Sequence, residues 1–223
     1  GIFDLPPGLT PWEAVQFARQ YLNRHSLNAI YYPWVIQETR GGKRYDPTVG
    51  YVAAVYSKND QIFGPWRAPA GMRYPLNIDG ISYTVKNADQ ELLYPQGINS
   101  ILRKPQGFFI WGVRTGGAVG GGGVDSGTAF MHVSTQRLFN LVKKSIKDGT
   151  QWAVFEPNAP ETWRRLKESA ENYLLFLHSL GAFAGFTPEE SFFVRVDAST
   201  NPPYLRDRGI LHGIIGIAPV KPA

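Results

Sequence analysis

The chain has 223 residues, of which 43% are hydrophobic and 18% charged, and this composition is typical of a folded protein with a sizeable core. It contains no cysteine, which excludes disulfides, thiolate zinc sites, iron–sulfur clusters and cysteine nucleophiles. The formal net charge of +5 is compatible with nucleic acid, an anionic membrane or an acidic protein partner and does not choose among them. No apolar run reaches the roughly 18 residues of a membrane helix, and the first residues lack the basic start of a signal peptide.

The first elements in chain order are a helix and a buried strand. Thr10-Pro11-Trp12-Glu13 has the spacing of a capping box with proline at the first helical position, so we expect a helix from Thr10 to Arg24. Residues 28–37 are apolar, β-branched or aromatic and predict a strand that Pro33 interrupts. A polar loop over 38–47 and a short helix over 49–56 follow.

The middle of the chain predicts short elements around one strand pair. We expect a strand over 81–85, a short helix over 88–94, and two strands over 98–102 and 108–113 that pair through Pro105-Gln106-Gly107. The glycine-rich residues 115–127 predict a surface loop, and a further strand is expected over 130–133.

The last third predicts two amphipathic helices and several strands. Ser134 is expected to cap a helix that Gly149 ends, and Pro160 to begin a long helix that runs to about Leu180. Strands are expected over 151–155, 191–196 and 210–217, with a single helical turn at 187–190. The alternation of helices and strands predicts an α/β fold, with a mixed β-sheet covered by helices on both faces.

Residue types that could carry chemistry lack the spacing that chemistry requires. The glycines of 116–123 are followed by strand-like residues and not by a helix with lysine, as a phosphate-binding loop requires. No Gly-x-Ser-x-Gly occurs, and Ser126 lies in the predicted surface loop. Glu189-Glu190 suits the first turn of a helix better than acid–base work.

The histidines complete this negative result. No pair of them has the spacing of metal ligands, the four being His25, His132, His178 and His212. We therefore predict no catalytic, metal-binding or cofactor-binding residue, and no enzyme activity. The most notable surface is the basic helix from Arg137 to Lys147, which is either an ordinary solvated face or a docking surface for an acidic partner.

Several sequence blocks, in order, resemble the tail sheath proteins of contractile phages and related injection machines. The resemblance covers roughly residues 29–223, with one departure in the glycine-rich loop 116–127. Each block alone is weak, and the series in the right order is specific. The blocks are Tyr31-Tyr32-Pro33-Trp34, Pro47-Thr48-Val49-Gly50-Tyr51-Val52, Asp60, Trp66-Arg67-Ala68-Pro69, Gly97-Ile98-Asn99-Ser100-Ile101, Ile110-Trp111-Gly112-Val113-Arg114-Thr115, Arg137-Leu138-Phe139-Asn140, Gly149-Thr150-Gln151-Trp152-Ala153-Val154-Phe155-Glu156-Pro157-Asn158, Thr187-Pro188-Glu189-Glu190 and Gly216-Ile217-Ala218-Pro219.

This resemblance implies a structural subunit that polymerises as stacked hexameric rings around an inner tube and contracts to drive the tube through a cell envelope. It implies that residues 1–125 are part of a subtilisin-like sheath core domain without a working triad, and that residues 126–223 are the C-terminal sheath domain. The implied partners are other sheath subunits, the inner tail tube protein, the baseplate and the tail terminator, with no membrane insertion and no direct nucleic-acid contact. The implied location is the virion tail sheath, assembled in the bacterial host cytoplasm.

Two sets of site residues follow as expectations. Terminal arms of sheath proteins add strands to the sheets of neighbouring subunits, and Ile210, Leu211, His212, Ile214 and Ile215 are the candidate edge for such pairing. Lys143, Lys144 and Lys147 are the candidate tube-facing charges because they cluster on one amphipathic helix. Both arms are expected to lie outside this sequence, and the fragment is expected to be monomeric.

Two other classes of function stay open at the level of sequence. An α/β hydrolase-like enzyme needs a rigid nucleophile beside a base, which the sequence does not offer. A basic nucleic-acid-binding α/β module is favoured by the pI and the aromatic content, and predicts affinity for DNA that falls steeply with salt.

Overall fold

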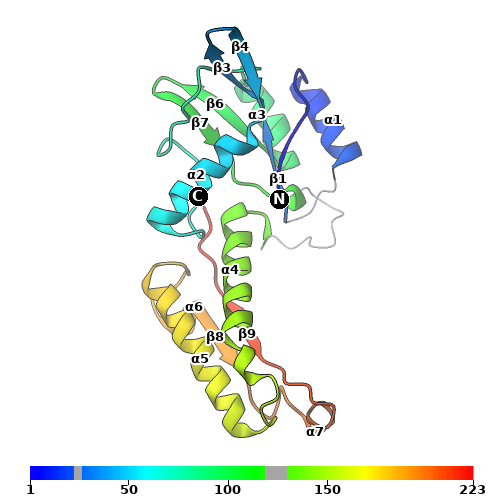
Figure 1. Ribbon diagram of the computed structural model, residues 1–223, viewed down its shortest axis with the longest axis vertical. Coiled ribbons are helices and arrows are strands. Elements are labelled where there is room, and N and C mark those ends of the chain that lie inside the picture. The colour runs from blue at the N-terminus through cyan, green and yellow to red at the C-terminus, as the bar shows by residue number, and fades with distance from the viewer. Residues whose placement is uncertain (23–26, 119–129, 223) are drawn as a thin grey trace. The chain divides into compact units, whose positions relative to one another are not determined.

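The computed structural model describes residues 1–22, 27–118 and 130–222, which form two compact units (Figure 1). Unit 1 comprises Gly1–Arg137 with the last residues from Lys221, and unit 2 comprises Leu138–Val220. The predicted domain boundary at 125/126 lies outside the described residues and stays a prediction. The helix α4 (Val133–Gly149) begins in unit 1 and continues into unit 2.

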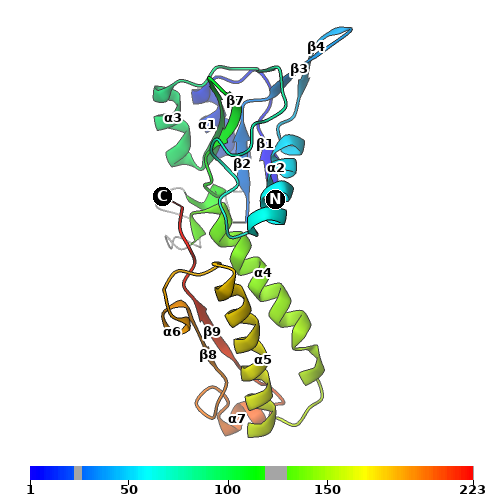
Figure 2. The same cartoon turned by 90° about the vertical axis from the view of Figure 1, so that its left-hand side faces the viewer.

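Unit 1 is built on a four-stranded mixed sheet. Its strand order is β1-β2-β6-β7, in which β1, β2 and β6 run parallel and β7 antiparallel. A second, three-stranded sheet has the order β4-β3-β5, and its β3–β4 hairpin extends away from the rest of the unit (Figure 2). The elements are β1 (Ile2–Asp4), α1 (Pro11–Tyr21), β2 (Ala29–Tyr32), β3 (Val35–Thr39), β4 (Gly42–Asp46), α2 (Val49–Phe63), β5 (Gly80–Ile81), α3 (Asn87–Leu93), β6 (Ile98–Lys104) and β7 (Gly107–Trp111).

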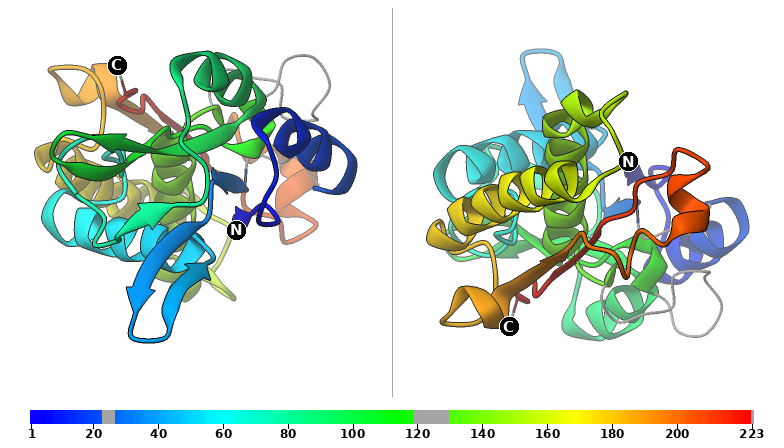
Figure 3. Two further views of the ribbon diagram at one scale, coloured as in Figure 1. Left: turned by 90° about the horizontal axis from the view of Figure 1, so that it is seen from above. Right: turned by 90° about the horizontal axis from the view of Figure 1, so that it is seen from below.

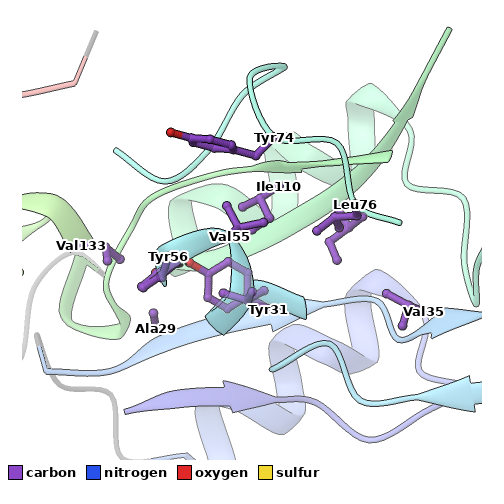
Figure 4. Close-up of a cluster of buried hydrophobic side chains, with 11 residues drawn as sticks. Ala29, Tyr31, Val35, Val55, Tyr56, Tyr74, Leu76, Ile110 and Val133 are labelled. Atoms are coloured by element: carbon purple, nitrogen blue, oxygen red, sulfur yellow. Dashed lines mark hydrogen bonds between the residues drawn. The ribbon is translucent and has the colours of Figure 1, made fainter. Parts of the chain in front are cut away.

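Helices cover both faces of the four-stranded sheet, as the sequence predicts (Figure 3, left). Successive side chains of a strand point to opposite faces, and all four residues of β2 are buried. Ile30 and Tyr32 pack in one cluster with α1 and α3, whereas Ala29 and Tyr31 pack in the other with α2 (Figure 4). The α/β class with a mixed sheet between helices is therefore confirmed.

A tyrosine pair and one asparagine make buried hydrogen bonds inside unit 1. The hydroxyls of Tyr31 and Tyr56 hydrogen-bond each other at 2.5 Å, and burial raises the pKa of Tyr56 to about 12. Asn99 is fully buried on β6, where its amide nitrogen donates to the carbonyls of Ile30 at 3.1 Å and Arg114 at 2.8 Å. Its side-chain oxygen accepts from the backbone nitrogen of Arg114 at 2.8 Å. Asn99 thus ties β6 to β2 and to the segment after β7.

Unit 2 combines two long helices with a two-stranded antiparallel sheet. It holds the part of α4 from Leu138 on, α5 (Pro160–Ser179), α6 (Pro188–Ser191), β8 (Phe192–Arg195), α7 (Pro203–Arg206) and β9 (Ile214–Ile217). The helix α5 lies beside β8 (Figure 1). Its buried residues recur at helical spacing and include Trp163, Leu166, Ala170, Leu174 and Leu177.

Three predicted elements are wrong for reasons of local geometry. The predicted polar loop 38–47 contains β4, because Gly42 adopts a φ of +111° and lets a charged strand pair with β3. The predicted strand 151–155 is instead a 3₁₀ turn over Gln151–Ala153, and Phe155 leaves the extended region with a φ of +72°. The predicted strand 130–133 is reduced to one bridge between Arg114 and His132, because α4 begins at Val133.

Other boundaries shift by a few residues. The strand expected over 210–217 is confined to Ile214–Ile217, and that expected over 81–85 to Gly80–Ile81. Ser134 lies inside the first turn of α4 and not before it. The helix expected over 49–56 extends to Phe63. The paired strands around Pro105-Gln106-Gly107, the capping box at Thr10 and the long helix from Pro160 are confirmed.

Candidate functional site

The described residues contain no cluster of three or more His, Asp or Glu side chains that could hold a metal ion. Within the same residues, no helix has the length and apolarity needed to cross a bilayer. His25 and Ser126 lie outside the described residues. His132 is partly buried, and burial, followed by the charges of Arg114 and Lys221, lowers its pKa.

One member of the acidic pair Glu189-Glu190 has a structural task. One carboxylate oxygen of Glu190 accepts hydrogen bonds from the backbone nitrogens of Phe186 at 2.9 Å and Thr187 at 3.4 Å, within the capping box of α6. Asp197 likewise accepts from the backbone nitrogen of Ser199 at 2.8 Å, and the hydrogen bonds from Ser199 lower its pKa. These carboxylates order turns, and the remaining candidates for function are surfaces.

The three lysines of α4 form one of these surfaces. Lys143, Lys144 and Lys147 are all exposed, whereas Leu138 and Val142 of the same helix are buried. Lys144 pairs with Asp148 at 2.8 Å, and its hydrogen bond to that carboxylate raises its pKa. The helix thus has an anchored apolar side and a basic side open to a partner, which suits an electrostatic contact. We call these three residues the α4 lysines.

The second surface is the small sheet of unit 2, since among the described residues neither β8 nor β9 pairs with a third strand. The sequence of β9 is Ile-Ile-Gly-Ile and carries no charge, unlike that of β4, which is Gly-Lys-Arg-Tyr-Asp. Charged edge strands resist pairing with other chains, and uncharged β-branched ones invite it. An uncharged edge on a stable domain is therefore a candidate site for strand addition.

The structure separates the five predicted edge residues into two groups. Ile214 and Ile215 lie in β9, opposite Arg195 and Val194 of β8. Ile210, Leu211 and His212 precede β9 and are held by side-chain amides instead of by a strand partner. These hydrogen bonds run from Asn158 Nδ2 to the Ile210 carbonyl at 2.9 Å, from Asn201 Nδ2 to the His212 carbonyl at 2.9 Å, and from the His212 nitrogen to Asn201 Oδ1 at 2.7 Å.

Sequence reasoning missed the ion pair that anchors the start of α4. The two guanidinium nitrogens of Arg137 hydrogen-bond the two carboxylate oxygens of Asp60 on α2, and the guanidinium also lies 4.8 Å from the ring centroid of Tyr56. Bidentate pairs of this kind are the stronger class of ion pair. Both charged residues occur in the blocks that carry the family resemblance, but they lie 77 residues apart, and no local pattern joins them.

Comparison with known proteins shows similarity to phage tail sheath proteins. Residues 125–222 match the family described as the phage tail sheath C-terminal domain. The chain is 29% identical over 181 residues to the tail sheath protein of Vibrio phage KVP40, covering 80% of this chain and 25% of that protein.

The solved structures that the chain resembles include chains of the anti-feeding prophage and of an extracellular contractile injection system. One match is a chain of the six-fold symmetrised baseplate of the anti-feeding prophage, with a TM-score of 0.84 and 32% identity. The alignment covers 100% of this chain and 57% of the baseplate chain. The sheath complex of an extracellular contractile injection system in its contracted state has a TM-score of 0.85 and 29% identity, over 99% of this chain and 60% of that chain. The chain therefore spans about a quarter of its curated phage relative and under two thirds of these structural relatives.

Proposed function

We propose that the chain is the conserved C-terminal part of a contractile sheath subunit, because residues 125–222 match the family of the phage tail sheath C-terminal domain. In this function the subunit polymerises as stacked hexameric rings around an inner tube, and contraction of the sheath drives the tube through a cell envelope. The observation that carries the proposal is the match of the whole chain, or nearly all of it, to chains of two contracted sheath structures at about 30% identity, which is a match of sequence as well as of fold.

The proposed role is structural and not enzymatic. Glu190, which sequence reasoning weighed for acid–base work, instead orders a turn, and Asp197 does the same. The proposed partners are other sheath subunits, the tube protein, the baseplate and the tail terminator. The proposed location is the tail sheath of a virion or a related particle that assembles in the cytoplasm of the bacterial host.

The direct test is electron microscopy of the natural protein that contains this sequence, expressed with and without its tube protein. Hollow tubes or stacked rings of six-fold symmetry are the expected result. Uniform small particles under all salt conditions, with the tube protein present, would overturn the proposal.

The α4 lysines are proposed to face the tube. Exposed ion pairs contribute about 0.5–1 kcal/mol each, so changing all three to glutamate is expected to weaken co-assembly with the tube at least about tenfold without unfolding the subunit. A matched control is the triple glutamate variant of Arg40, Lys43 and Arg44, which are equally exposed and also include one ion-paired residue, Arg44 with Asp46 at 2.7 Å. Co-sedimentation with preformed tubes measures both. Equal loss in the two variants would assign the effect to net charge alone.

The edge of β9 is proposed to receive an arm of a neighbouring subunit. The backbone nitrogen of Ala218 donates to the Ser191 carbonyl at 2.8 Å, and the register pairs Gly216 with Phe193 and Ile215 with Val194. Hydrogen-bonded and non-bonded pairs alternate in an antiparallel ladder. The N–H of Gly216 therefore faces β8, and that of Ile215 faces the open edge.

This alternation gives a test for the arm site. Ile215→Pro removes only an outward-facing backbone donor, and edge strands tolerate this loss. The 223-residue chain with this substitution is therefore expected to keep its circular dichroism spectrum, whereas the full protein is expected to lose assembly. Gly216→Pro is the contrasting variant and is expected to disrupt the sheet itself. Normal tubes formed by Ile215→Pro would remove β9 as the arm site.

A further inference from the structure

Five large apolar side chains of unit 2 are exposed near the end of α5, in the loop before α6 and at the start of β8, and we call this set the α5–β8 patch. Its members are large side chains that a soluble monomer seldom exposes together. The exposed side chains are Leu175 (42%), Phe176 (57%), Leu180 (51%), Phe186 (99%) and Phe193 (52%).

A groove of about 360 Å³ runs through this patch. Leu175 and Phe193 line it together with Pro188, Phe192 and Val194, and two acidic residues, Glu171 and Glu189, also line it. The loop beside it is ordered, since Glu190 accepts hydrogen bonds from the backbone of Phe186 and Thr187. The groove is therefore a preformed apolar site with an acidic border.

A complementary apolar projection is present elsewhere on the same unit. Val154 and Phe155 are 61% and 102% exposed, and we call them the knob. Phe155 adopts a φ of +72°, a conformation that is an outlier for a bulky side chain and is often kept for a function. The turn is fixed by backbone hydrogen bonds from Val154 to Gln151 at 3.1 Å and from Glu156 to Ala153 at 3.2 Å.

The surroundings of the knob are mainly basic, in contrast to the border of the groove. Arg206 lines a cavity together with Phe155, and the guanidinium of Arg165 lies 4.4 Å from the ring centroid of Trp152 in the turn. Glu156 is the acidic residue beside the knob. Arg165 and Arg206 outweigh Glu156, so the knob is net positive. Glu171 and Glu189 outweigh Lys167, which pairs with Glu171 at 3.7 Å, so the groove is net negative. Complementary charges orient an encounter.

Knob and patch belong to opposite ends of α5. Phe155 precedes the first residue of this helix, Pro160, whereas Leu175 and Leu180 lie at its end. At 1.5 Å per residue the two sites are separated by roughly 20–30 Å, so a knob cannot fill the groove of its own chain. Two different complementary sites on one molecule make a head-to-tail contact, which repeats to give rings or helical filaments.

We propose that the knob of one copy of this chain inserts into the groove of the α5–β8 patch of a second copy, as a direct contact between sheath subunits. This inference rests on the proposed function, because it requires that the protein assemble with itself. It adds a side-chain contact to the strand pairing at β9 and assigns the fully exposed Phe155 as its central residue.

Disulfide trapping tests the contact, with any cysteine that the natural full protein carries outside these 223 residues first replaced by serine, because these residues contain none. The natural full protein is prepared with Phe155→Cys and Phe193→Cys together, assembled, oxidised and run on a denaturing gel. A ladder of covalent oligomers is expected, whereas Phe155→Cys with Tyr45→Cys, a control at an exposed residue of β4, is expected to stay monomeric. Assembled particles of the double variant that give no ladder would overturn the proposal.

A second measurement covers the case in which the cysteines prevent assembly. Phe155→Asn replaces the knob by a residue that tolerates a positive φ, so thermal stability should be unchanged or raised while the yield of assembled particles falls at least tenfold. Wild-type yield with this variant would overturn the contact. The unmodified protein is imaged first, and if it forms no particles, the proposed function fails. If it forms particles and Phe155→Asn forms them in the same yield, only this inference fails.

Discussion

Replacing Asn99 by leucine is expected to lower the free energy of unfolding by roughly 3 kcal/mol. The substitution keeps a similar volume but removes the donor to the carbonyls of Ile30 and Arg114 and the acceptor of the Arg114 nitrogen. These backbone groups then lose a partner in a site from which water is excluded, and leaving buried polar groups unpaired is costly.

The measurement is urea denaturation followed by circular dichroism, with the slope of the transition checked for two-state behaviour. Asn77→Leu is the matched control, because Asn77 is exposed and the same substitution there should change stability by about 0.5 kcal/mol or less. A change as small as that for Asn99→Leu would mean that the buried amide does not hold β6 to its neighbours.

Replacing Leu174 by alanine is expected to cost about 3 kcal/mol, because Leu174 on α5 is fully buried and its truncation leaves a cavity. The adjacent Leu175→Ala is expected to be nearly neutral for stability, since that side chain is 42% exposed. The pair differs in one further respect: only Leu175 belongs to the α5–β8 patch.

Two measurements on the same two variants therefore separate core from surface. Thermal unfolding should show a lowered midpoint for Leu174→Ala alone, and particle yield per folded subunit should show a loss for Leu175→Ala alone. Equal midpoints would place Leu174 outside the core of unit 2. Undiminished assembly of Leu175→Ala would remove this residue from the proposed contact between subunits.

Local signals in the sequence predict the elements that local physics determines. The Thr10–Glu13 spacing predicts a capping box, and Glu13 does accept from the Thr10 nitrogen at 2.8 Å. The periodicity of α5 predicts its buried stripe, and helical spacing also predicts that the α4 lysines are exposed. These results depend on contacts within about four residues, which the sequence displays directly.

Features that depend on distant contacts are not predictable in this way. The Arg137–Asp60 pair joins residues 77 apart, and the polar sequence of β4 gives no sign of its partner β3 except for its glycine turn. The apolar run at 151–155 is typical of a buried strand, and nothing in it indicates that Phe155 leaves the extended conformation. The apolar sequence before β9 likewise predicts a longer strand, but the Asn201 side chain hydrogen-bonds the backbone of His212 and takes the place of a strand partner there.

The contrast between the edges of β4 and β9 has a consequence for the subunit during its synthesis. An uncharged strand end that awaits a neighbour is also open to any extended chain nearby, including unfolded copies of the same protein. The charges of Lys43 and Arg44 protect β4 from pairing with other chains. The uncharged residues Ile214, Ile215 and Ile217 give β9 no such protection. Soluble yield should therefore depend on timing: capture by a growing particle competes with aggregation, so slower or cooler expression favours recovery of usable subunits.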